Sequence, residues 1–314
     1  MNKLLVAALL GFAPAPALAL QDAPAAQAPA QAPAAAAPLP DADPALWVVR
    51  DEDTIVYLFG TFHLLDGRPW FNDEVKAAFD ASDELVVEVL LPEDPAELQA
   101  AMQPLILQYA VDPQGRTISS RLTPAQNEAL NAALAPLGAP AGVFDRFEPW
   151  FVAMMLAQAA AQQIGLDPQY GPELALRRAA AERGMEEGQL ETIESQLRIL
   201  DSIPEDDQLE GLRDALDDTN ELREKLAPML ESWSTGDVER LAAIMNEDLA
   251  DDPDLYEALF TARNATWARW IDERLDRPGT VFVAVGGGHL AGPDSVQDQL
   301  RALGIASERV PNAE

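Results

Sequence analysis

Two apolar runs, each followed closely by a histidine, are the strongest feature of the hydrophobic pattern along the chain. The first run is Thr54–Phe59, which leads to His63, and the second is Thr280–Val285, which leads to His289. Runs of this length that are rich in β-branched and aromatic residues predict buried strands. In both places the order is Thr, five residues, Gly, two residues, His and Leu, which predicts a related pair of strand ends.

The remaining pattern predicts a few further strands and many helices. The hairpin of Leu46–Arg50 and Thr54–Phe59, followed by a helix and another strand, predicts some parallel sheet. The other predicted strands are Glu84–Leu90, Gln189–Ile193 and Ala306–Val310. Apolar residues spaced three and four apart predict helices from Asn72 to Phe79, at Ala96–Tyr109, Pro124–Leu134, Phe147–Ile164 and Gly171–Ala181, from Glu194 onward, in two or three acidic segments within 205–275 that include Asp254–Leu275, and at Asp294–Leu303.

The predicted strands gather near the two ends of the folded part, and helices fill the region between them. We therefore expect an α/β fold in which strands from both chain ends join one sheet and meet at a central cleft, with a large helical insert as a cap. This arrangement brings His63 and His289 towards each other. Ligands in open α/β sheets bind at the edge formed by the strand ends.

The amino-terminal region predicts export. Residues 1–19 have a weakly positive start, a short apolar stretch and an Ala-Leu-Ala processing site, as a signal peptide does. Residues 20–44 consist largely of Ala, Pro and Gln and are expected to form a disordered linker, so that one domain covers 45–314. We expect a periplasmic or secreted protein with no stable membrane insertion after signal cleavage, because no later apolar run approaches about 20 residues.

Composition excludes some partners and leaves others open. The chain has 53 acidic and 21 basic residues and a formal net charge of −32. Binding of nucleic acid is not expected, because contact with the phosphate backbone needs a basic surface. The acidity is explained either by attraction of cationic substrates or by a solvated surface that keeps the protein soluble. The oligomeric state is left open.

The glycines at the strand ends are expected to aim the side chains that follow them. Gly60 and Gly286 each end an apolar run, where glycine permits backbone angles closed to other residues. The stretch 286–288 is also a weak candidate for a phosphate-binding loop, because the lysine of a P-loop is absent.

His63, His289 and Glu88 are the candidate metal ligands. Two imidazoles and one carboxylate leave positions open for water, as catalytic metal sites do. On the predicted strand Glu88 shares a face with Val86 and Leu90, an apolar setting in which a carboxylate needs a partner or a metal. The alternatives are that the histidines are hydrogen-bonded turn residues and that Glu88 faces solvent from an edge strand.

Three further charged residues are weaker candidates. Glu191 is a second candidate general base. Glu173 follows Pro172 at a predicted helix start, where a carboxylate is favoured by the helix dipole alone. Arg263 is a candidate for binding a substrate carboxylate or an oxyanion, with a surface ion pair as the alternative.

Taken together, these residues resemble the TraB/PrgY/GumN family, to which the animal Tiki proteases are related. The resemblance spans roughly 45–311 and rests on Tyr57–His63, Leu85–Val89 with Glu88, Leu190–Thr192 with Gln196, Arg263-Asn264, and Gly286–His289 with Gly292. It implies an α/β fold of two related halves around a cleft, with His63, His289 and Glu88 at the family's motif positions. For Tiki-like members it also implies proteolysis that depends on a divalent metal, with manganese or cobalt as candidates. Pro172 departs from the aliphatic residue common between the matching Gly and acid of the family.

Two functions are consistent with these observations. The first is a divalent-metal-dependent hydrolase of the peptidase class, in which the metal activates water, Glu88 or Glu191 takes the proton, and Arg263 stabilises the developing charge. Manganese or cobalt is the expected ion, with zinc as an alternative, and the expected partner is a peptide or protein substrate. The second is a non-catalytic binding protein that sequesters a peptide, haem or metal in the same cleft.

Overall fold

The computed structural model describes residues 39–71, 73–135, 142–217, 221–249 and 252–312 of the 314-residue chain. The predicted signal peptide and most of the predicted linker lie outside these ranges. The last part of that linker is nevertheless packed on the domain, because Ala42 is fully buried and its N–H donates to the carbonyl of Pro69 at 2.9 Å. Packing against the domain therefore includes residues just before the boundary predicted at residue 45.

Strands from both ends of the chain form one mixed sheet of six strands in the order β4-β3-β5-β2-β1-β6. Their bounds are β1 Leu46–Arg50, β2 Thr54–Thr61, β3 Glu84–Val87, β4 Glu186–Gln189, β5 Gly279–Gly286 and β6 Ser307–Arg309. The parallel pairs are β2 with β5, β5 with β3, and β3 with β4, whereas β1 runs antiparallel to β2 and β6. The prediction that early and late strands join one sheet is confirmed.

Two predicted strands are present with different bounds. The strand predicted as Glu84–Leu90 ends at Val87, and the strand predicted as Gln189–Ile193 is β4, three residues earlier. β4 has the polar sequence Glu-Glu-Gly-Gln because it forms the exposed edge of the sheet, so no apolar alternation marks it. Glu191 thus lies in the turn that leads to Thr192, the N-cap of the next helix.

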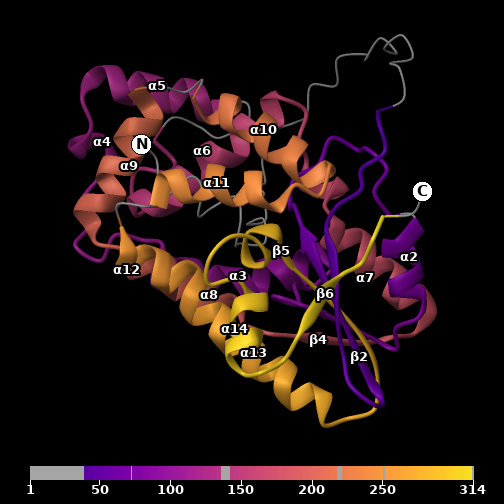
Figure 1. Ribbon diagram of the computed structural model, residues 1–314. Coiled ribbons are helices and arrows are strands. Elements are labelled where there is room, and N and C mark those ends of the chain that lie inside the picture. Colours follow the sequence, from indigo (N-terminus) through magenta and orange to yellow (C-terminus); the bar gives the residue numbers. More distant parts are fainter. Residues whose placement is uncertain (1–38, 72, 136–141, 218–220, 250–251, 313–314) are drawn as a thin grey trace.

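Helices cover both faces of the sheet, as Figure 1 shows. The valines of β5 pack on one face with Trp267 and Ile271, whereas Phe282 and Ala284 belong to the larger core on the opposite face. The helices are α2 Asp73–Asp80, α3 Pro95–Tyr109, α4 Ile118–Arg121, α5 Pro124–Leu134, α6 Pro149–Gln163, η2 Pro168–Tyr170, α7 Pro172–Arg183, α8 Ile193–Asp201, α9 Glu205–Asp217, α10 Glu221–Ser234, α11 Val238–Leu249, α12 Pro253–Tyr256, η3 Glu257–Thr261, α13 Ala262–Leu275, η4 Gly287–Leu290 and α14 Val296–Ala302.

Several of these helices gather on one side of the molecule. In Figure 1, α4, α5, α6 and α9 lie together at the upper left, away from the strands. α10 extends from this group to the sheet, where Trp233 donates to the carbonyl oxygen of Gly60 in β2 at 2.8 Å. α6 is the centre of this group, because it contacts α5, α9 and α10 and most of its side chains are buried. None of the helices in the described ranges has both the length and the apolar character needed to cross a bilayer.

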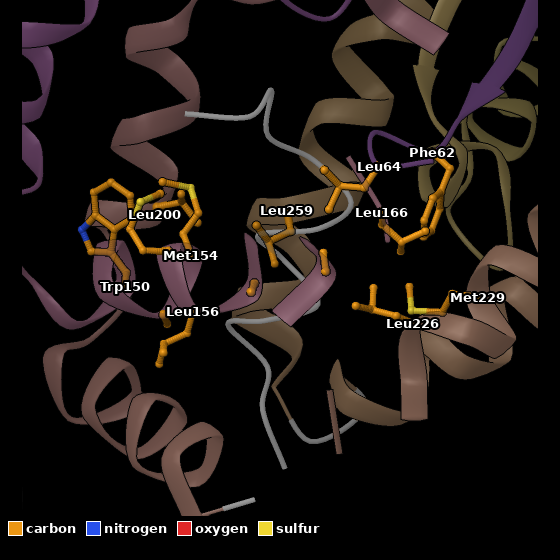
Figure 2. Close-up of a cluster of buried hydrophobic side chains, with 14 of the residues drawn as sticks. Phe62, Leu64, Trp150, Met154, Leu156, Leu166, Leu200, Leu226, Met229 and Leu259 are labelled. Atoms are coloured by element: carbon orange, nitrogen blue, oxygen red, sulfur yellow. The ribbon is translucent and has the colours of Figure 1, made fainter. Parts of the chain in front are cut away.

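The loop that carries His63 is fixed by apolar side chains on either side of the histidine. Figure 2 shows Phe62 and Leu64 close to Leu166 and to Leu226 and Met229 of α10. All five side chains are at least nine-tenths buried. This packing holds the histidine between two anchored neighbours, so its ring position is defined by the core.

Candidate functional site

The two Gly-x-x-His turns lie side by side because β2 and β5 pair in parallel, with the two motifs offset by one residue so that Thr61 lies opposite Gly286. The glycines serve this close approach. A Cβ atom on Gly60 would lie 3.1 Å from the Cα atom of Gly287. Neither Gly60 nor Gly286 is among the described glycines with positive φ, so the predicted reason for these glycines was wrong. Gly292 does adopt such a conformation, at φ 71°.

His63 is held by a carboxylate and keeps one ring nitrogen without a protein partner. Its Nδ1 atom lies 2.6 Å from Oε1 of Glu173, a short contact whose angle departs from that of a well-formed hydrogen bond. Its Nε2 atom is buried and has no hydrogen-bond partner among the described residues. Glu173 is in the first turn of α7, and Gly171 before it is required because a Cβ there would lie 2.5 Å from the carbonyl oxygen of His63. Pro172 fits as the first helical residue.

The pair of His63 and Glu173 favours its charged form. Burial lowers the pKa of His63, but the charge of Glu173 and the contact with it raise this pKa by more, so the net direction is upward. Burial raises the pKa of Glu173, and His63 outweighs that effect and lowers it. The histidine is thus a stronger base than a free imidazole.

His289 is enclosed and bonded through both ring nitrogens. Its Nε2 atom is 3.0 Å from Nη1 of Arg263, and its Nδ1 atom is 2.6 Å from Oδ1 of Asn264. The ring is fully buried and contacts the rings of Phe260 and Trp267. Burial and the charge of Arg263 hold the pKa of His289 well below its ordinary value. Because a guanidinium can only donate, the neighbours select the neutral tautomer with the proton on Nδ1.

Arg263 joins the second histidine to two carboxylates. Its Nη2 donates to Oε2 of Glu88 and its Nε to Oε1 of Glu191, each at 2.8 Å. The side chain is only 5% exposed, so the alternative of a surface ion pair is wrong. We call Arg263, Glu88, Glu191 and His289 the Arg263 cluster. The π-helical turn η3 immediately precedes Arg263 in the chain, and such turns occur frequently at functional sites.

Glu88 lies just beyond the end of β3, and both of its carboxylate oxygens accept hydrogen bonds. Oε1 accepts from the backbone N–H of Gly286 at 2.7 Å, and Oε2 accepts from Gln196 at 3.0 Å as well as from Arg263. Burial raises the pKa of Glu88, and Arg263 opposes that effect without reversing it. Glu191 also accepts from the indole N–H of Trp267 at 3.1 Å. Both predicted carboxylates therefore act as partners of Arg263 in the structure.

A pocket of about 420 Å³ opens beside the first histidine at the carboxyl edge of β3 and β5. Its walls include His63, Glu88, Glu173 and Gln196, whereas His289, Arg263 and Glu191 do not line it. A volume of this size is in the range of sites that bind small molecules, about 300–1,000 Å³. The structure therefore brings the candidate residues into one neighbourhood, and of these it presents His63, Glu88 and Glu173 to the pocket.

The predicted metal ligands do not form a ready three-ligand site. Among the residues in the described ranges, no three His, Asp or Glu side chains are grouped so that they could hold a metal ion. Both nitrogens of His289 and both oxygens of Glu88 already have protein partners, and only Nε2 of His63 has none. Metal binding by His63, His289 and Glu88 stays a prediction, and it requires Arg263 to leave Nε2 of His289.

The site contains residues that sequence reasoning did not select. Glu173 was interpreted as a helix-start carboxylate, and it is that, but it also holds His63. Gln196 and Asn264 were noticed only as parts of the resemblance, and they bond to Glu88 and His289. The sequence marks these residues only as polar positions within helical segments. That pattern does not show which side chain each of them contacts.

Fold and site together define an α/β protein with a buried histidine–carboxylate pair at the ends of parallel strands. Residues 45–309 match the TraB/PrgY/gumN family, and the chain belongs to that family. It is 26% identical to the uncharacterised protein YbaP of Escherichia coli (strain K12) over 260 residues, which are 82% of this chain and 92% of the relative. YbaP of Shigella flexneri is 27% identical with the same coverage, and an uncharacterised protein of Treponema pallidum (strain Nichols) is 25% identical over 81% of this chain and 79% of the relative. No solved structure matches the chain.

Proposed function

We propose that this protein is a hydrolase that cleaves peptide bonds in the pocket beside His63, and that it acts outside the cytoplasm as its amino terminus predicts. One observation carries the proposal: His63 lines a pocket with its Nδ1 against Glu173, while its Nε2 has no hydrogen-bond partner in the part of the chain that the structure describes. This is the arrangement of a general base whose orientation and charge are controlled by a carboxylate.

In the proposed reaction, Nε2 of His63 takes a proton from water as the water oxygen bonds to the carbonyl carbon of the substrate. The imidazolium formed is stabilised by Glu173. When the carbon–nitrogen bond breaks, His63 returns the proton to the leaving amine. General acid–base catalysis of this kind contributes about 10²- to 10⁴-fold to a rate.

The Arg263 cluster is proposed to have a structural role, in which Arg263 holds Glu88 in its position at the pocket. The base role suggested by sequence for Glu88 or Glu191 is assigned here to His63, because both oxygens of Glu88 accept hydrogen bonds, and Oε1 of Glu191 does so as well while Glu191 does not line the pocket. Stabilisation of an oxyanion by Arg263 remains a proposal that requires the guanidinium to reach the pocket.

A divalent cation, manganese or cobalt with zinc as an alternative, is proposed as a cofactor on the resemblance and not on the observed geometry. The side chains as arranged do not fit a cation shared by His63, His289 and Glu88, so the reaction above contains no metal step. Bound to this protein, a cation would polarise the substrate carbonyl or lower the pKa of a water. A cation bound at Nε2 of His63, which has no hydrogen-bond partner among the described residues, would take the position of the proton that this nitrogen accepts in the reaction above.

The test is cleavage of a mixture of synthetic peptides by the full chain without a histidine tag, read by mass spectrometry. Reactions contain manganese, cobalt, zinc or a chelator. We expect new peptide termini from the unmodified protein, none from His63→Gln, and few from Glu173→Gln. The matched control is Glu182→Gln, on the same helix α7 but exposed, which should cleave as the unmodified protein does.

Absence of cleavage under every metal condition would contradict the hydrolase proposal. Recovery of bound, uncut peptide would then favour the alternative, a binding protein. Haem capture between both histidines is disfavoured by the full burial of His289 and the engagement of both its nitrogens. A Soret absorption on adding haem that is lost in His289→Gln would support it nonetheless.

A further inference from the structure

One side of the pocket is an apolar wall built by three segments. The wall consists of Val87, Val89, Leu91, Pro92, Leu98 and Leu174. The first four follow directly along the chain from the end of β3, Leu98 belongs to α3 and Leu174 to α7. Leu174 follows Glu173 in sequence, so the same helical turn presents both the partner of His63 and an apolar side chain to the pocket. Any substrate that reaches His63 therefore meets apolar surface.

The charged groups around this wall are engaged with one another. Glu173 pairs with His63 and Glu88 with Arg263. Arg177 also lines the pocket, donates to the carbonyl oxygen of Leu91 and faces Glu187 at 3.4 Å. The remaining charged residue of the lining, Glu93, is half exposed and lies 3.9 Å from Arg177. Because these charges are compensated by the protein, an ionic group of a substrate gains little there and is disfavoured by desolvation.

Neutral amides complete the lining. Gln158 and Gln162 of α6 and Gln169 of η2 line the pocket, and no hydrogen bond among the described residues uses their side chains. A glutamine side chain both donates and accepts, which matches the N–H and C=O groups of a peptide backbone. Pockets that combine apolar walls with a few neutral polar groups of this kind bind uncharged ligands by burial and fix their orientation by hydrogen bonds.

From these observations we infer that the pocket recognises a neutral, extended peptide segment with a large apolar side chain, such as leucine or phenylalanine. That side chain packs on the apolar wall, and the glutamine amides bond to the flanking backbone. Leu98 is a specificity-determining residue in this inference. Recognition does not depend on turnover; only the placement of the scissile bond near His63 rests on the proposed function.

The test measures binding with fluorescent, acetylated and amidated peptides of the form Ala-Ala-X-Ala-Ala, where X is Phe, Leu, Gly, Asp or Lys. Anisotropy titrations use the His63→Gln protein, so that the peptides are not consumed. We expect the Phe and Leu peptides to bind at least about tenfold more tightly than the Asp and Lys peptides, since burial of a large apolar side chain contributes on the order of 1.5 kcal/mol and 1.4 kcal/mol is tenfold.

A matched pair of variants distinguishes the effect of a charge on the apolar wall from the effect of a new charge elsewhere on the same helix. Leu98→Asp places a carboxylate on the apolar wall and should weaken binding of the Phe peptide by roughly tenfold. Leu107→Asp is on the same helix α3, but Leu107 is 53% exposed and does not line the pocket. It should bind as the parent does. Thermal melts of both variants check that the fold is kept.

The outcomes distinguish this inference from the proposed function. Tight binding of apolar peptides, weakened by Leu98→Asp but accompanied by no cleavage in the unmodified protein, would support the inference and contradict the hydrolase. Cleavage of the whole panel without preference for X, unchanged in Leu98→Asp, would support the hydrolase and overturn the inference. Peptides that neither bind nor are cleaved would overturn both.

Discussion

His63 and His289 follow matching sequences on neighbouring parallel strands, and their surroundings are opposite. Around His63, one nitrogen contacts a carboxylate, the other has no partner among the described residues, and a pocket is adjacent. Around His289, an amide and a guanidinium occupy both nitrogens and the ring is fully buried. The pKa of the first is raised and that of the second is strongly lowered. A repeated motif can therefore place one histidine beside a pocket and enclose the other among buried partners.

The largest difference between the two turns is expected in catalysis. His63→Gln removes the proposed base, so the peptide cleavage rate should fall about 10²- to 10⁴-fold. The glutamine amide can still donate to Glu173, which keeps the turn in place. The rate is measured with a single peptide found in the cleavage screen. An unchanged rate in His63→Gln would show that the base lies elsewhere.

His289 is expected to matter most for stability. His289→Leu leaves Nη1 of Arg263 and the amide of Asn264 with a lost partner in a buried region, which should lower the free energy of unfolding by about 2–4 kcal/mol. His289→Gln can replace one of the two bonds and should lose less. Urea denaturation measures both variants. Equal stability of His289→Leu and the unmodified protein would contradict this role of His289 in stability.

A smaller effect is expected on the pH profile of cleavage. The base must be neutral, and the pKa of His63 is raised, so the rate should fall as the pH drops through that raised value. Glu173→Gln removes the charge that raises this pKa and leaves the burial that lowers it. The acid limb of the profile should therefore move to lower pH, with a slower rate at its plateau because the imidazolium loses its partner. An acid limb that stays at the same pH in Glu173→Gln would contradict the claim that Glu173 raises the pKa of His63.

The free energy of unfolding should also depend on pH through the pair of His63 and Glu173, because the pKa of His63 is raised in the folded state. The protonated form of His63, paired with Glu173, contributes stability that is fully present below the ordinary histidine pKa. That contribution is lost as the pH rises through the raised pKa of the folded state. Urea titrations at several pH values should show this loss in the unmodified protein and not in Glu173→Gln.

The smallest expected effect compares two glycines near the turns. In Gly171→Ala the new Cβ would meet the carbonyl oxygen of His63 at 2.5 Å, and a backbone atom cannot easily move. In Gly288→Ala the new Cβ would meet the terminal methyl of Met245, which is the flexible end of a side chain. Gly171→Ala should cost about 1–3 kcal/mol of stability and reduce cleavage, and Gly288→Ala should cost less. The reverse order would contradict the packing described around His63.

The elements that could be predicted are those whose own sequence carries a clear pattern of apolar residues. β2 and β5 are buried on both faces, so their continuous apolar runs were visible, and their shared order of residues placed the two histidines together. β4 was misplaced because an exposed edge strand carries no apolar alternation. The register of β4 depends on pairing with β3, which no local pattern contains.

The contacts that define the site could not be predicted for the same reason. Glu173 reaches His63 and Arg263 reaches Glu88 across long stretches of chain, and only the packed fold decides which side chains meet. A glutamate in the first turn of α7 satisfies a local preference whether or not a histidine is near it. The alternative that a matched histidine is a hydrogen-bonded turn residue describes the surroundings of His289 in this structure, while the surroundings of His63 suit a reactive group.

Nuclear magnetic resonance of the protein labelled with ¹⁵N in histidine tests the difference between the turns most directly, because His63 and His289 are its only histidines. The His63→Gln variant assigns the two rings. We predict that the His289 ring stays neutral with its proton on Nδ1 between about pH 5 and 8, the range in which free histidine titrates. We predict that His63 titrates in the same samples with a pKa above 6.5. Two rings that titrate alike, or a His289 that becomes protonated while the protein is folded, would contradict the account.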